Sequence, residues 1–426
     1  MKIINLLPFL SALNGINMKL AGLNIRMDQL IIVFLMIILF LSNILGKIKL
    51  YLDKTGRLLL LFFIWSFAIS FLLSPNHKYS LVETINLLSS ASVYFVLTNL
   101  LRSKKNINKY FKSFLWAGIL STSYGIIIFV LSIIGLKIYG VNLNENGSMA
   151  YGVFATMREP NIFGSFSLIY FILSLVIILS LPKEKRKYNK LVVYLIFSSG
   201  LGLFLSFTRG VWLAAIVGVI ITLGTNKEIS NYIRKKGTSI FLLAIFVFFI
   251  LIIGNILISN SIIRYKISHL FDYSGGTGAG RIDIWENAFK SFLESPWFGR
   301  GTYSYAAIYS PELVGSGGQE SVAWIGNLFL TLLHDTGIIG MVIFLGMTFV
   351  LLKEGIKSAK WFMDVSPMNA AISYGFCISL VCLIIAFIFT TGFSYVYAWS
   401  VLGFIGVYNR NRKLLEREHI MTAVSI

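Results

Sequence analysis

Long runs of apolar residues recur along nearly the whole chain, and short polar loops separate them. A helix of about 20 residues crosses the roughly 30 Å hydrocarbon core of a membrane, so such runs are typical of membrane-spanning helices. The pattern predicts eleven of them. We expect these spans near residues 28–46, 57–75, 80–101, 113–136, 162–182, 190–206, 210–224, 238–258, 326–352, 369–390 and 394–409.

The N-terminal segment, residues 3–20, is a weaker twelfth candidate because it contains Pro8, three asparagines and Lys19. A signal peptide is a second interpretation, but Lys2 is the only early charge and no small-x-small cleavage site is evident. If the segment crosses, the chain has about twelve spans and both ends are cytoplasmic. If it lies on the outer interface instead, eleven spans remain.

Composition and charge support a multi-pass membrane protein. Hydrophobic residues make up 56% and aromatic residues 15% of the chain, and the mean hydropathy is +0.78, well above soluble domains. Basic residues concentrate in alternate loops, as the positive-inside rule requires of cytoplasmic loops. The net charge of +19 therefore reflects topology rather than nucleic-acid binding, since no basic stripe with interleaved aromatics occurs. The basic loops follow residues 46, 101, 182, 226 and 352, and the tail follows residue 409.

This alternation leaves two sizeable segments on the outer face, residues 137–161 and residues 259–325. We therefore expect an N-terminal transmembrane bundle (1–258), an extracytoplasmic loop or lid (259–325), and C-terminal transmembrane helices with a cytoplasmic tail (326–426). Within the loop, the glycine-rich stretches 272–280 and 314–318 are predicted to be flexible connecting segments. An amphipathic helix is predicted between them from residue 281, closed by Pro296, with one apolar face. That face comprises Ile282, Trp285, Phe289 and Phe292.

Several kinds of chemistry find no support in the sequence. Cys377 and Cys382 are five residues apart in one apolar span and point to different sides of the helix, so neither a disulfide nor a metal site is expected. The four histidines lack ligand spacing. The glycine string before Arg281 lacks the Gly-Lys-Ser/Thr ending of a phosphate loop.

Arginines on the outer face are the candidate chemistry. Arg158 stands in "MREPN" and Arg209 in "FTRG", while Arg281 and Arg300 flank the amphipathic helix. A single arginine at a membrane interface is equally well explained by snorkelling. Four on one face favour an anionic ligand, because guanidinium stays charged and binds phosphate oxygens through paired hydrogen bonds. The pattern therefore indicates a lipid-linked pyrophosphate at the outer leaflet.

Three motifs in sequence order carry a family resemblance. They are "SFTRGVWLA" (206–214), "GRIDIWENAFKSFLESPWFGRGTYSY" (280–305) and "NLFLTLLHDTGIIG" (327–340), with "REPNIFG" (158–164) ahead of them. The chain over roughly residues 150–345 resembles the O-antigen ligase and Wzy-type polymerase superfamily. The resemblance implies an all-α, GT-C-like membrane protein of the cytoplasmic (inner) membrane whose active site faces outward.

The same resemblance implies glycosyl transfer from undecaprenyl pyrophosphate. The partners it implies are a lipid-linked oligosaccharide donor and acceptor, membrane lipid, a flippase and a chain-length regulator. Pyrophosphate is a good leaving group, so arginines can stabilise the developing charge without a metal or cofactor. Direct displacement would invert the anomeric configuration. We expect a polymerase of lipid-linked repeat units, with ligation to a lipid A core as the alternative.

One departure from the family motif favours the polymerase. Gly326 stands where the family's ligases commonly carry a histidine before Asn327, and His334 is expected to be a polar group packed within the bundle instead. The general base could then be Glu159, Glu320 or Asp283. Each of these carboxylates is equally well explained as the ion-pair partner of an arginine.

The predicted site falls into two sets of residues. Arg209 and Arg281 are expected to bind the pyrophosphate, with Arg158 on its far side and Arg300 nearer the glycan. Arg281 would open its helix, where the N-terminal dipole also favours an anion. Trp285 either stacks on sugar rings or seats the lid. The catalytic set is Arg209, Arg281, Glu159 and Glu320, and the substrate-binding set is Arg158, Asn161, Trp285, Arg300, Tyr305 and Asn327.

A lipid-linked glycan transporter is the alternative from another functional class. It could use the same arginines as a passive binding track. Transporters of this kind show internal repeats and charges deep in several spans. Here no convincing repeat is found, and only Asp28, Glu83 and Asp335 fall within spans or at their ends.

Overall fold

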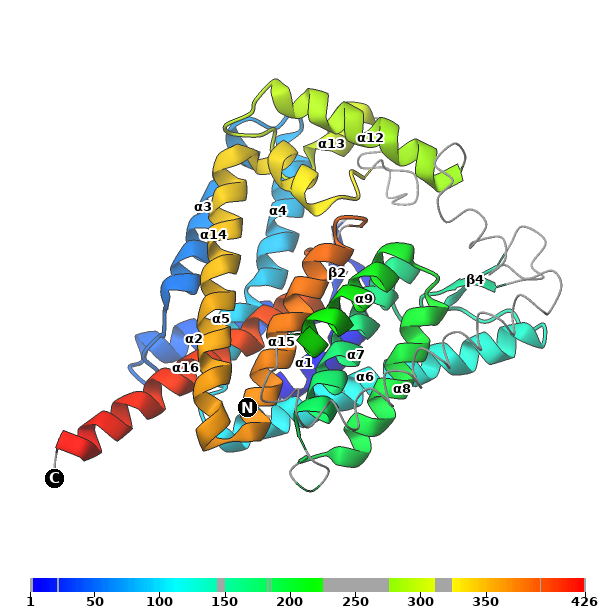
Figure 1. Ribbon diagram of the computed structural model, residues 1–426. Helices are drawn as coiled ribbons and strands as arrows, with labels where there is room; N and C mark the ends of the chain where they lie inside the picture. The colour runs from blue at the N-terminus through cyan, green and yellow to red at the C-terminus, as the bar shows by residue number, and fades with distance from the viewer. Residues whose placement is uncertain are drawn as a thin grey trace.

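The computed structural model describes residues 3–20, 23–143, 150–181, 184, 186–224, 276–310, 324–390 and 392–424. Within these ranges the protein is almost entirely helical (Figure 1). The N-terminal half contains η1 (Ile3–Leu6), α1 (Leu7–Ala12), α2 (Met27–Ile44), α3 (Lys54–Leu72), α4 (His77–Ala91), α5 (Val93–Leu100), α6 (Lys104–Ile133) and α7 (Pro160–Ser180). The rest contains α8 (Asn189–Leu205), α9 (Arg209–Gly224), α12 (Gly276–Leu293), α13 (Ser304–Tyr309), α14 (Leu328–Val365), α15 (Pro367–Ala386) and α16 (Val396–Val424).

Two short antiparallel hairpins interrupt the helices. The first pairs β1 (Asn17–Leu20) with β2 (Leu23–Arg26), and the second pairs β3 (Val141–Leu143) with β4 (Ala150–Val153). The first hairpin changes the prediction for residues 3–20. Instead of one continuous crossing, the helical part ends at Ala12 and covers ten residues, which is about half the length of a span.

Seven helices in the described part of the chain are long and apolar enough to cross a membrane. They are Met27–Ile44, Lys54–Leu72, His77–Leu100, Lys104–Ile133, Pro160–Ser180, Leu328–Val365 and Pro367–Ala386. Three more apolar helices, Ile3–Ala12, Asn189–Leu205 and Arg209–Gly224, are shorter. The helices follow the predicted apolar runs closely, but the expected count of about twelve spans is not shown. The predicted span 238–258 lies outside the described residues.

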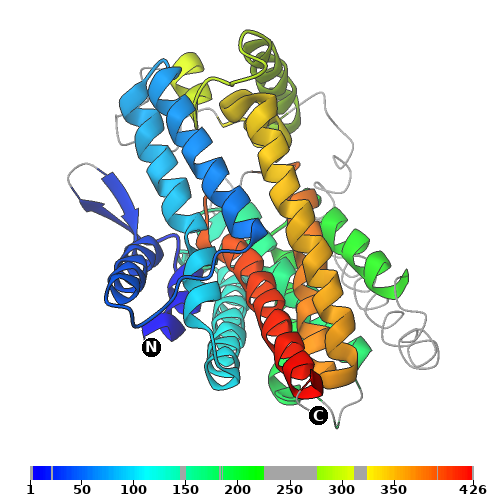
Figure 2. The same ribbon diagram turned by 90° about the vertical axis from the view of Figure 1, so that its left-hand side faces the viewer.

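The helices form two packed groups. In one group α3 packs on α4 and on α14, and in the other α15 and α8 pack on α7 while α9 packs on α15. Helices α5 and α16 pack against each other, and α16 contacts both α14 and α15, so it joins the groups (Figures 1 and 2). The core between them is rich in fully buried aromatic side chains.

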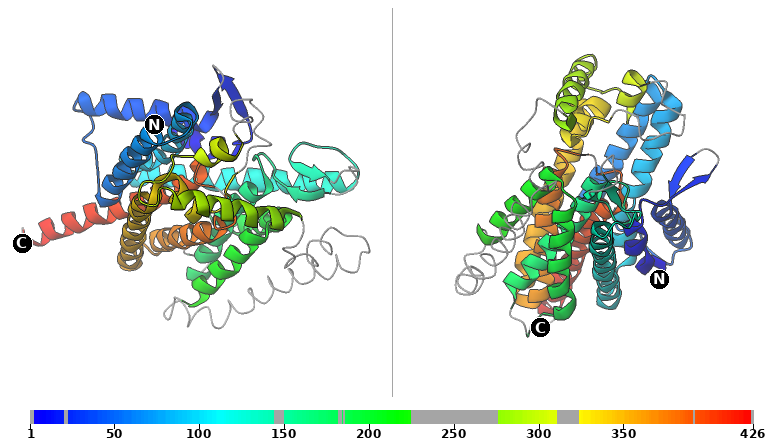
Figure 3. Two further views of the ribbon diagram at one scale, coloured as in Figure 1. Left: turned by 90° about the horizontal axis from the view of Figure 1, so that it is seen from above. Right: turned by 90° about the vertical axis from the view of Figure 1, so that its right-hand side faces the viewer.

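Helices α12 and α13 lie at one end of the molecule, opposite the end that carries the C-terminus (Figures 1 and 2). Seen from above, α12 runs from the end of α14 across towards α9, over both helix groups (Figure 3). This is the segment that the sequence predicted as an amphipathic helix of an outer loop. Its place at one end of the bundle fits that prediction.

The buried face of α12 differs from the predicted one. Ala288, Ser291 and Phe292 are buried, whereas Ile282 is 48% exposed and Phe289 is 49% exposed. The helix also begins at Gly276, so it includes residues of the glycine-rich stretch that was predicted to be a flexible connecting segment. Glycine lowers helix propensity by about 1 kcal/mol per residue, so the local sequence did not predict this start of the helix.

Orientation in the membrane is a prediction from the basic loops that a fusion experiment checks. A reporter fused after Lys187 is expected to behave as cytoplasmic, because the preceding loop is strongly basic. A reporter fused near Ser316 is expected on the opposite side. The measurement is the activity of a paired alkaline phosphatase and green fluorescent protein reporter, and finding both fusions on one side would overturn the topology.

Candidate active site

The first part of the site is the start of α7. Pro160 occupies the first helical position, where its missing N–H is harmless, and Glu159 before it takes the extended conformation that a following proline favours. Asn161 is engaged at both ends of its amide, since Nδ2 donates to Thr390 Oγ1 and Oδ1 accepts from the N–H of Ile162 at 3.1 Å. Asn161 therefore fixes the start of α7, while Glu159 is exposed.

The second part is the start of α9, which Arg209 opens. A Cβ atom at Gly210 would lie 2.7 Å from the ring of Phe389, so only glycine allows this close approach. Trp212 stacks on Phe204 at 5.5 Å and donates its indole N–H to the carbonyl of Leu203. The glycine and tryptophan of "TRGVW" thus serve packing, and they hold Arg209 half-buried at the end of the helix.

Arg281 approaches Arg209 from α12. Although Arg281 retains solvent contact, partial burial lowers its pKa, the positive charge of Arg209 lowers it further, and Glu159 acts in the opposite direction. Three elements that are distant in sequence therefore bring two arginines and one carboxylate within electrostatic range. We call Arg209, Arg281 and Glu159 the arginine–glutamate group. Because α12 begins at Gly276, Arg281 lies in its second turn, and the predicted dipole effect of a helix-opening position does not apply.

Arg158 faces a neighbouring part of the site. It lies within hydrogen-bonding and electrostatic range of the Tyr395 hydroxyl, and Glu159 also acts on that hydroxyl. Tyr395 is held in turn by Arg26, whose guanidinium carbon lies 4.9 Å from the ring centroid. Arg26 also donates to Ser90 Oγ at 2.8 Å and to the carbonyl of Ser394 at 2.6 Å.

Arg26 was missed by the sequence analysis. It ends β2, and its Nε lies 3.3 Å from Oδ1 of Asp28, which is buried in the first turn of α2. The available signal was a basic residue two positions before an acidic residue at the start of an apolar run. That signal does not reveal the contacts to α4 and to the turn before α16, which are long-range.

The structure also shows how the turn that carries Arg300 is fixed. Helix α14 is interrupted at Gly337, which has φ 66° and ψ −174°. The segment from Pro296 to Gly301 pairs with this interruption through four backbone hydrogen bonds. They run from Arg300 N to His334 O at 2.8 Å, Gly301 N to Asp335 O at 2.9 Å, Ile338 N to Pro296 O at 2.9 Å and Ile339 N to Trp297 O at 3.3 Å.

This backbone pairing gives a structural role to two of the sequence motifs, "PWFGRG" and "DTGIIG". A helix break leaves donors and acceptors unpaired, and burying them unpaired is costly. Trp65 on α3 donates to the remaining carbonyl, that of Thr336, at 2.8 Å. The stretches "PWFGRG" and "DTGIIG" are therefore complementary parts of one joint, which we call the α14 joint (Pro296–Gly301 with His334–Ile339).

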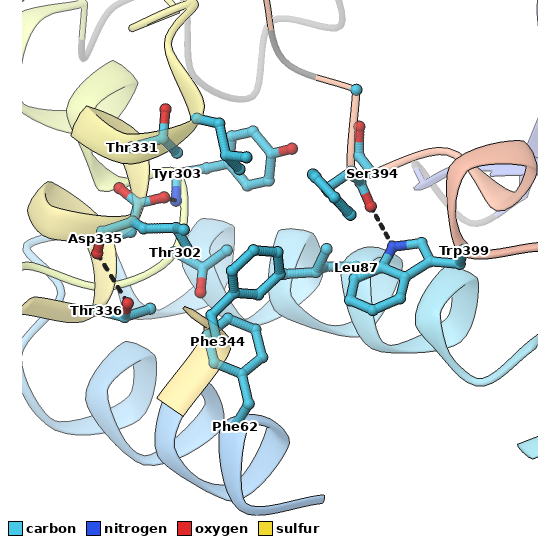
Figure 4. Close-up of a pocket in the computed structure, with 14 residues that line it drawn as sticks. Phe62, Leu87, Thr302, Tyr303, Thr331, Asp335, Thr336, Phe344, Ser394 and Trp399 are labelled. Carbon is cyan, nitrogen blue, oxygen red and sulfur yellow. Dashed lines mark hydrogen bonds between the residues drawn. The ribbon is translucent and has the colours of Figure 1, made fainter. Parts of the chain in front are cut away.

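The α14 joint also positions Tyr303. Asp335 Oδ2 accepts from the backbone N–H of Tyr303 at 2.8 Å (Figure 4). Burial, and then the negative charge of Glu83, raises the pKa of the Tyr303 phenol, so it stays protonated near neutral pH. A cavity of about 60 Å³ lies beside Tyr303, lined mainly by apolar side chains that include Phe62, Leu87 and Trp399. It has room for only a few water molecules.

Other predicted site residues take packing or capping positions. Arg300 forms its ion pair with Glu294 at the end of α12. Trp285 donates to the carbonyl of Ile325 at 2.8 Å, Tyr305 is 4% exposed and packs against His334, and Asn327 caps α14 by accepting from the N–H of Leu330 at 3.1 Å. Trp285 therefore seats α12 on the bundle. Glu320 lies outside the described residues, and Asp283 is exposed on α12.

The prediction for His334 is confirmed. Its side chain is fully buried, with Nδ1 2.8 Å from Asp335 Oδ1 and Nε2 3.2 Å from Ser291 Oγ, so it links α14 to α12. Gly326, the position that replaces the family histidine, lies just before α14 with φ +63°. In the described part of the chain, no group of three or more His, Cys, Asp or Glu side chains is arranged to hold a metal ion.

Comparison with known proteins supports the resemblance on which these motifs were read. No curated protein matches the chain. A family model does match, over residues 191–345, and its description is O-antigen ligase. The matched range contains Arg209, Arg281 and both halves of the α14 joint, whereas Arg158 and Glu159 precede it. Residues 191–345 are thus similar to the O-antigen ligase domain that this family model describes, in agreement with the resemblance of the motifs.

Proposed function

We propose that this protein polymerises oligosaccharide repeat units carried on undecaprenyl pyrophosphate, at the outer face of the cytoplasmic membrane. The observation that carries the proposal is the arginine–glutamate group, which assembles Arg209 and Arg281 from α9 and α12 inside the O-antigen ligase domain. The two arginines lie within electrostatic range, and the positive charge of Arg209 lowers the pKa of Arg281. Such a pair is favourable when an anion of high charge, such as pyrophosphate, binds between them.

The chemistry follows from where charge develops. As the bond between the anomeric carbon and the pyrophosphate oxygen breaks, negative charge accumulates on the leaving group. Arg209 and Arg281 stabilise that charge, because each guanidinium can donate paired hydrogen bonds to the phosphate oxygens. The acceptor is a hydroxyl of a second lipid-linked repeat unit, and its attack from the opposite side inverts the anomeric configuration.

The polymerase is favoured over the ligase by Gly326. A glycine at this position supplies no side chain to activate an acceptor hydroxyl, and its left-handed backbone conformation is one that other residues adopt at a cost of roughly 1 kcal/mol or more. The ligase histidine therefore has no counterpart at Gly326.

A reconstituted reaction with a defined lipid-linked repeat unit tests the proposal. We expect release of undecaprenyl pyrophosphate together with longer lipid-linked glycans, and an unchanged rate in excess EDTA, since arginines supply the positive charge. The competing acceptor is lipid A core, offered in the same vesicles. Glycan transfer to lipid A alone would establish a ligase, and translocation without release of undecaprenyl pyrophosphate would establish a transporter.

A further inference from the structure

The N-terminal half of α4 is held firmly on the side that faces α3. Thr84 Oγ1 donates to Ser70 Oγ at 2.9 Å, and Ser70 Oγ donates to Thr302 Oγ1 at 3.1 Å, next to Tyr303. Ser74 and Ser80 share a further hydrogen bond at 2.6 Å. These hydroxyls are buried, so α4 is fixed in rotation relative to both α3 and the α14 joint.

A second polar face of α4 points to the start of α2 and to the turn before α16. Ser90 accepts from Arg26 and donates to the carbonyl of Ser394 at 2.8 Å, and Gln29 Nε2 donates to the carbonyl of Asn86 at 3.0 Å. Glu83 lies three residues before Asn86 and seven before Ser90, so it continues this face towards the end of the molecule that carries α12.

The Glu83 side chain is half-buried, and the hydrogen bonding of its carboxylate is weak. Its described hydrogen bond comes from Asn86 Nδ2 to Oε2 at 3.5 Å, at the limit of a useful hydrogen bond, and it occupies one of the two oxygens. A structural carboxylate in such a place would be expected to accept short bonds from a cation, as Glu354 does from Arg412 at 2.6 Å at the other end of the molecule.

Charged and titratable groups surround Glu83 from every neighbouring element. Arg26, before α2, and Arg158, before α7, lie within electrostatic range of the carboxylate. The Tyr79 and Tyr303 phenols are also within range of Glu83, and both are within range of Asp335 on α14. The Glu83 carboxylate thus lies within range of two cations and two phenols, and Asp335 lies within range of both phenols.

Glu83 and Arg281 occupy different ends of one site. Arg281 interacts electrostatically with Arg209 and Glu159, whereas Glu83 interacts with Arg26 and Arg158. The two ends meet at the consecutive residues Arg158 and Glu159, which open α7. Glu83 belongs to the helix group of α3, α4 and α14, and Arg209 to the group of α7, α9 and α15. Glu83 and the arginine–glutamate group thus come from different helices, and Arg158 and Glu159 connect them.

We propose, resting on the transferase function above, that Glu83 is the general base for the acceptor hydroxyl. The acceptor oxygen forms its bond to the anomeric carbon of the donor while its proton passes to the Glu83 carboxylate. The bond from that carbon to the pyrophosphate oxygen breaks, and its electron pair leaves with the pyrophosphate, which the arginines bind. Glu83 then returns the proton to water.

This assignment differs from the base candidates that the sequence offered. Glu159 lies beside Arg209 and Arg281, where a carboxylate competes with pyrophosphate for the arginines rather than for a hydroxyl proton. Asp283 is on the exposed side of α12. An inverting attack comes from the side opposite the leaving group, and Glu83 is assigned to that side.

Glu83→Gln is the decisive variant because it keeps the shape of the side chain and removes the base. Loss of a general base is expected to lower kcat by about 100-fold to 10,000-fold, with little change in KM for the lipid-linked donor. The wild-type rate should fall at acidic pH as Glu83 becomes protonated, and this acidic limb should be absent in Glu83→Gln. Glu83→Asp should react at a reduced rate and show an acidic limb displaced from that of the wild type.

Glu286→Gln is the matched control, since Glu286 is exposed on α12 and pairs only with Lys290 among its described ionic contacts. It should retain wild-type kcat. A Glu83→Gln enzyme with kcat within threefold of wild type overturns the assignment of the base, while an inactive wild-type enzyme overturns the transferase function itself. If Glu83→Gln does not accumulate, the pH profile of Glu83→Asp decides: a displaced acidic limb supports the proposal, and an unmoved limb refutes it.

Discussion

Arg281→Ala is expected to lower the rate of polymerisation by about 30-fold to 1,000-fold. The loss corresponds to roughly 2–4 kcal/mol of transition-state stabilisation, the usual value of a charged donor aimed at a developing anion. Arg281 is exposed on the second turn of α12 and helps little in packing, so the protein level and thermal stability should stay near wild type. The measurement is kcat/KM for release of undecaprenyl pyrophosphate.

Substitution by lysine sharpens this test. Arg281→Lys keeps a positive charge but cannot present the planar fork that binds two phosphate oxygens together, so it should recover little activity. Lys290→Ala is the control, because Lys290 is on the same helix and equally cationic, but it pairs with Glu286 on the exposed surface. Normal polymerisation by Arg281→Ala would make Arg281 an interface anchor rather than a ligand of pyrophosphate.

Gly337→Ala is expected to destabilise the protein severely. The φ and ψ values of Gly337 are nearly exclusive to glycine, which alone costs another residue roughly 1–3 kcal/mol. A Cβ atom there would also overlap the carbonyl of Trp297, so the backbone pairing of the α14 joint would have to open. We expect a clear fall in the unfolding temperature of the detergent-solubilised protein, or failure to accumulate in the membrane.

A second glycine of α14 provides a control in which the same substitution should not lower the stability. Gly346 lies within regular α14, and a Cβ atom there would meet open space. Gly346→Ala should leave the unfolding temperature unchanged or raise it, since alanine is favoured over glycine in a helix by about 0.5–1 kcal/mol. Equal stability of the two variants would show that the α14 joint does not hold the fold.

The helices were largely predictable because the membrane imposes a simple rule on the sequence. A crossing needs a continuous apolar run, and α3, α7 and α15 each follow such a run within a few residues. The N-terminal segment failed this rule at Lys19 and the asparagines, and the structure there is a short helix and a hairpin. The motif order around Arg209 and Arg281 was likewise sufficient for the family, which the match over residues 191–345 confirms.

The composition of the site was harder to predict, since it depends on contacts between distant segments. Trp285 and Tyr305 were placed in the substrate-binding set, with seating of the lid as the alternative for Trp285, and here both fill the space between α12, α13 and α14. Arg26 and Glu83 were not singled out, because their partners lie tens to hundreds of residues away. The break at Gly337 was not predicted, because the predicted span 326–352 runs through it and the polar residues His334 to Thr336 beside it were not taken as an interruption.

Because the α14 joint holds one end of α12, a small rotation at the joint displaces the other end of the helix by a larger distance. The joint clamps the chain just beyond Leu293, whereas Arg281 lies twelve residues away along the helix, at a distance of roughly 18 Å from the clamp. A tilt of about ten degrees at the clamp would therefore carry the guanidinium through about 3 Å, the full length of a hydrogen bond. The angular stiffness of the backbone seam on α14, together with the hydrogen bond from Trp285 to Ile325, thus sets the spatial tolerance with which Arg281 meets Arg209.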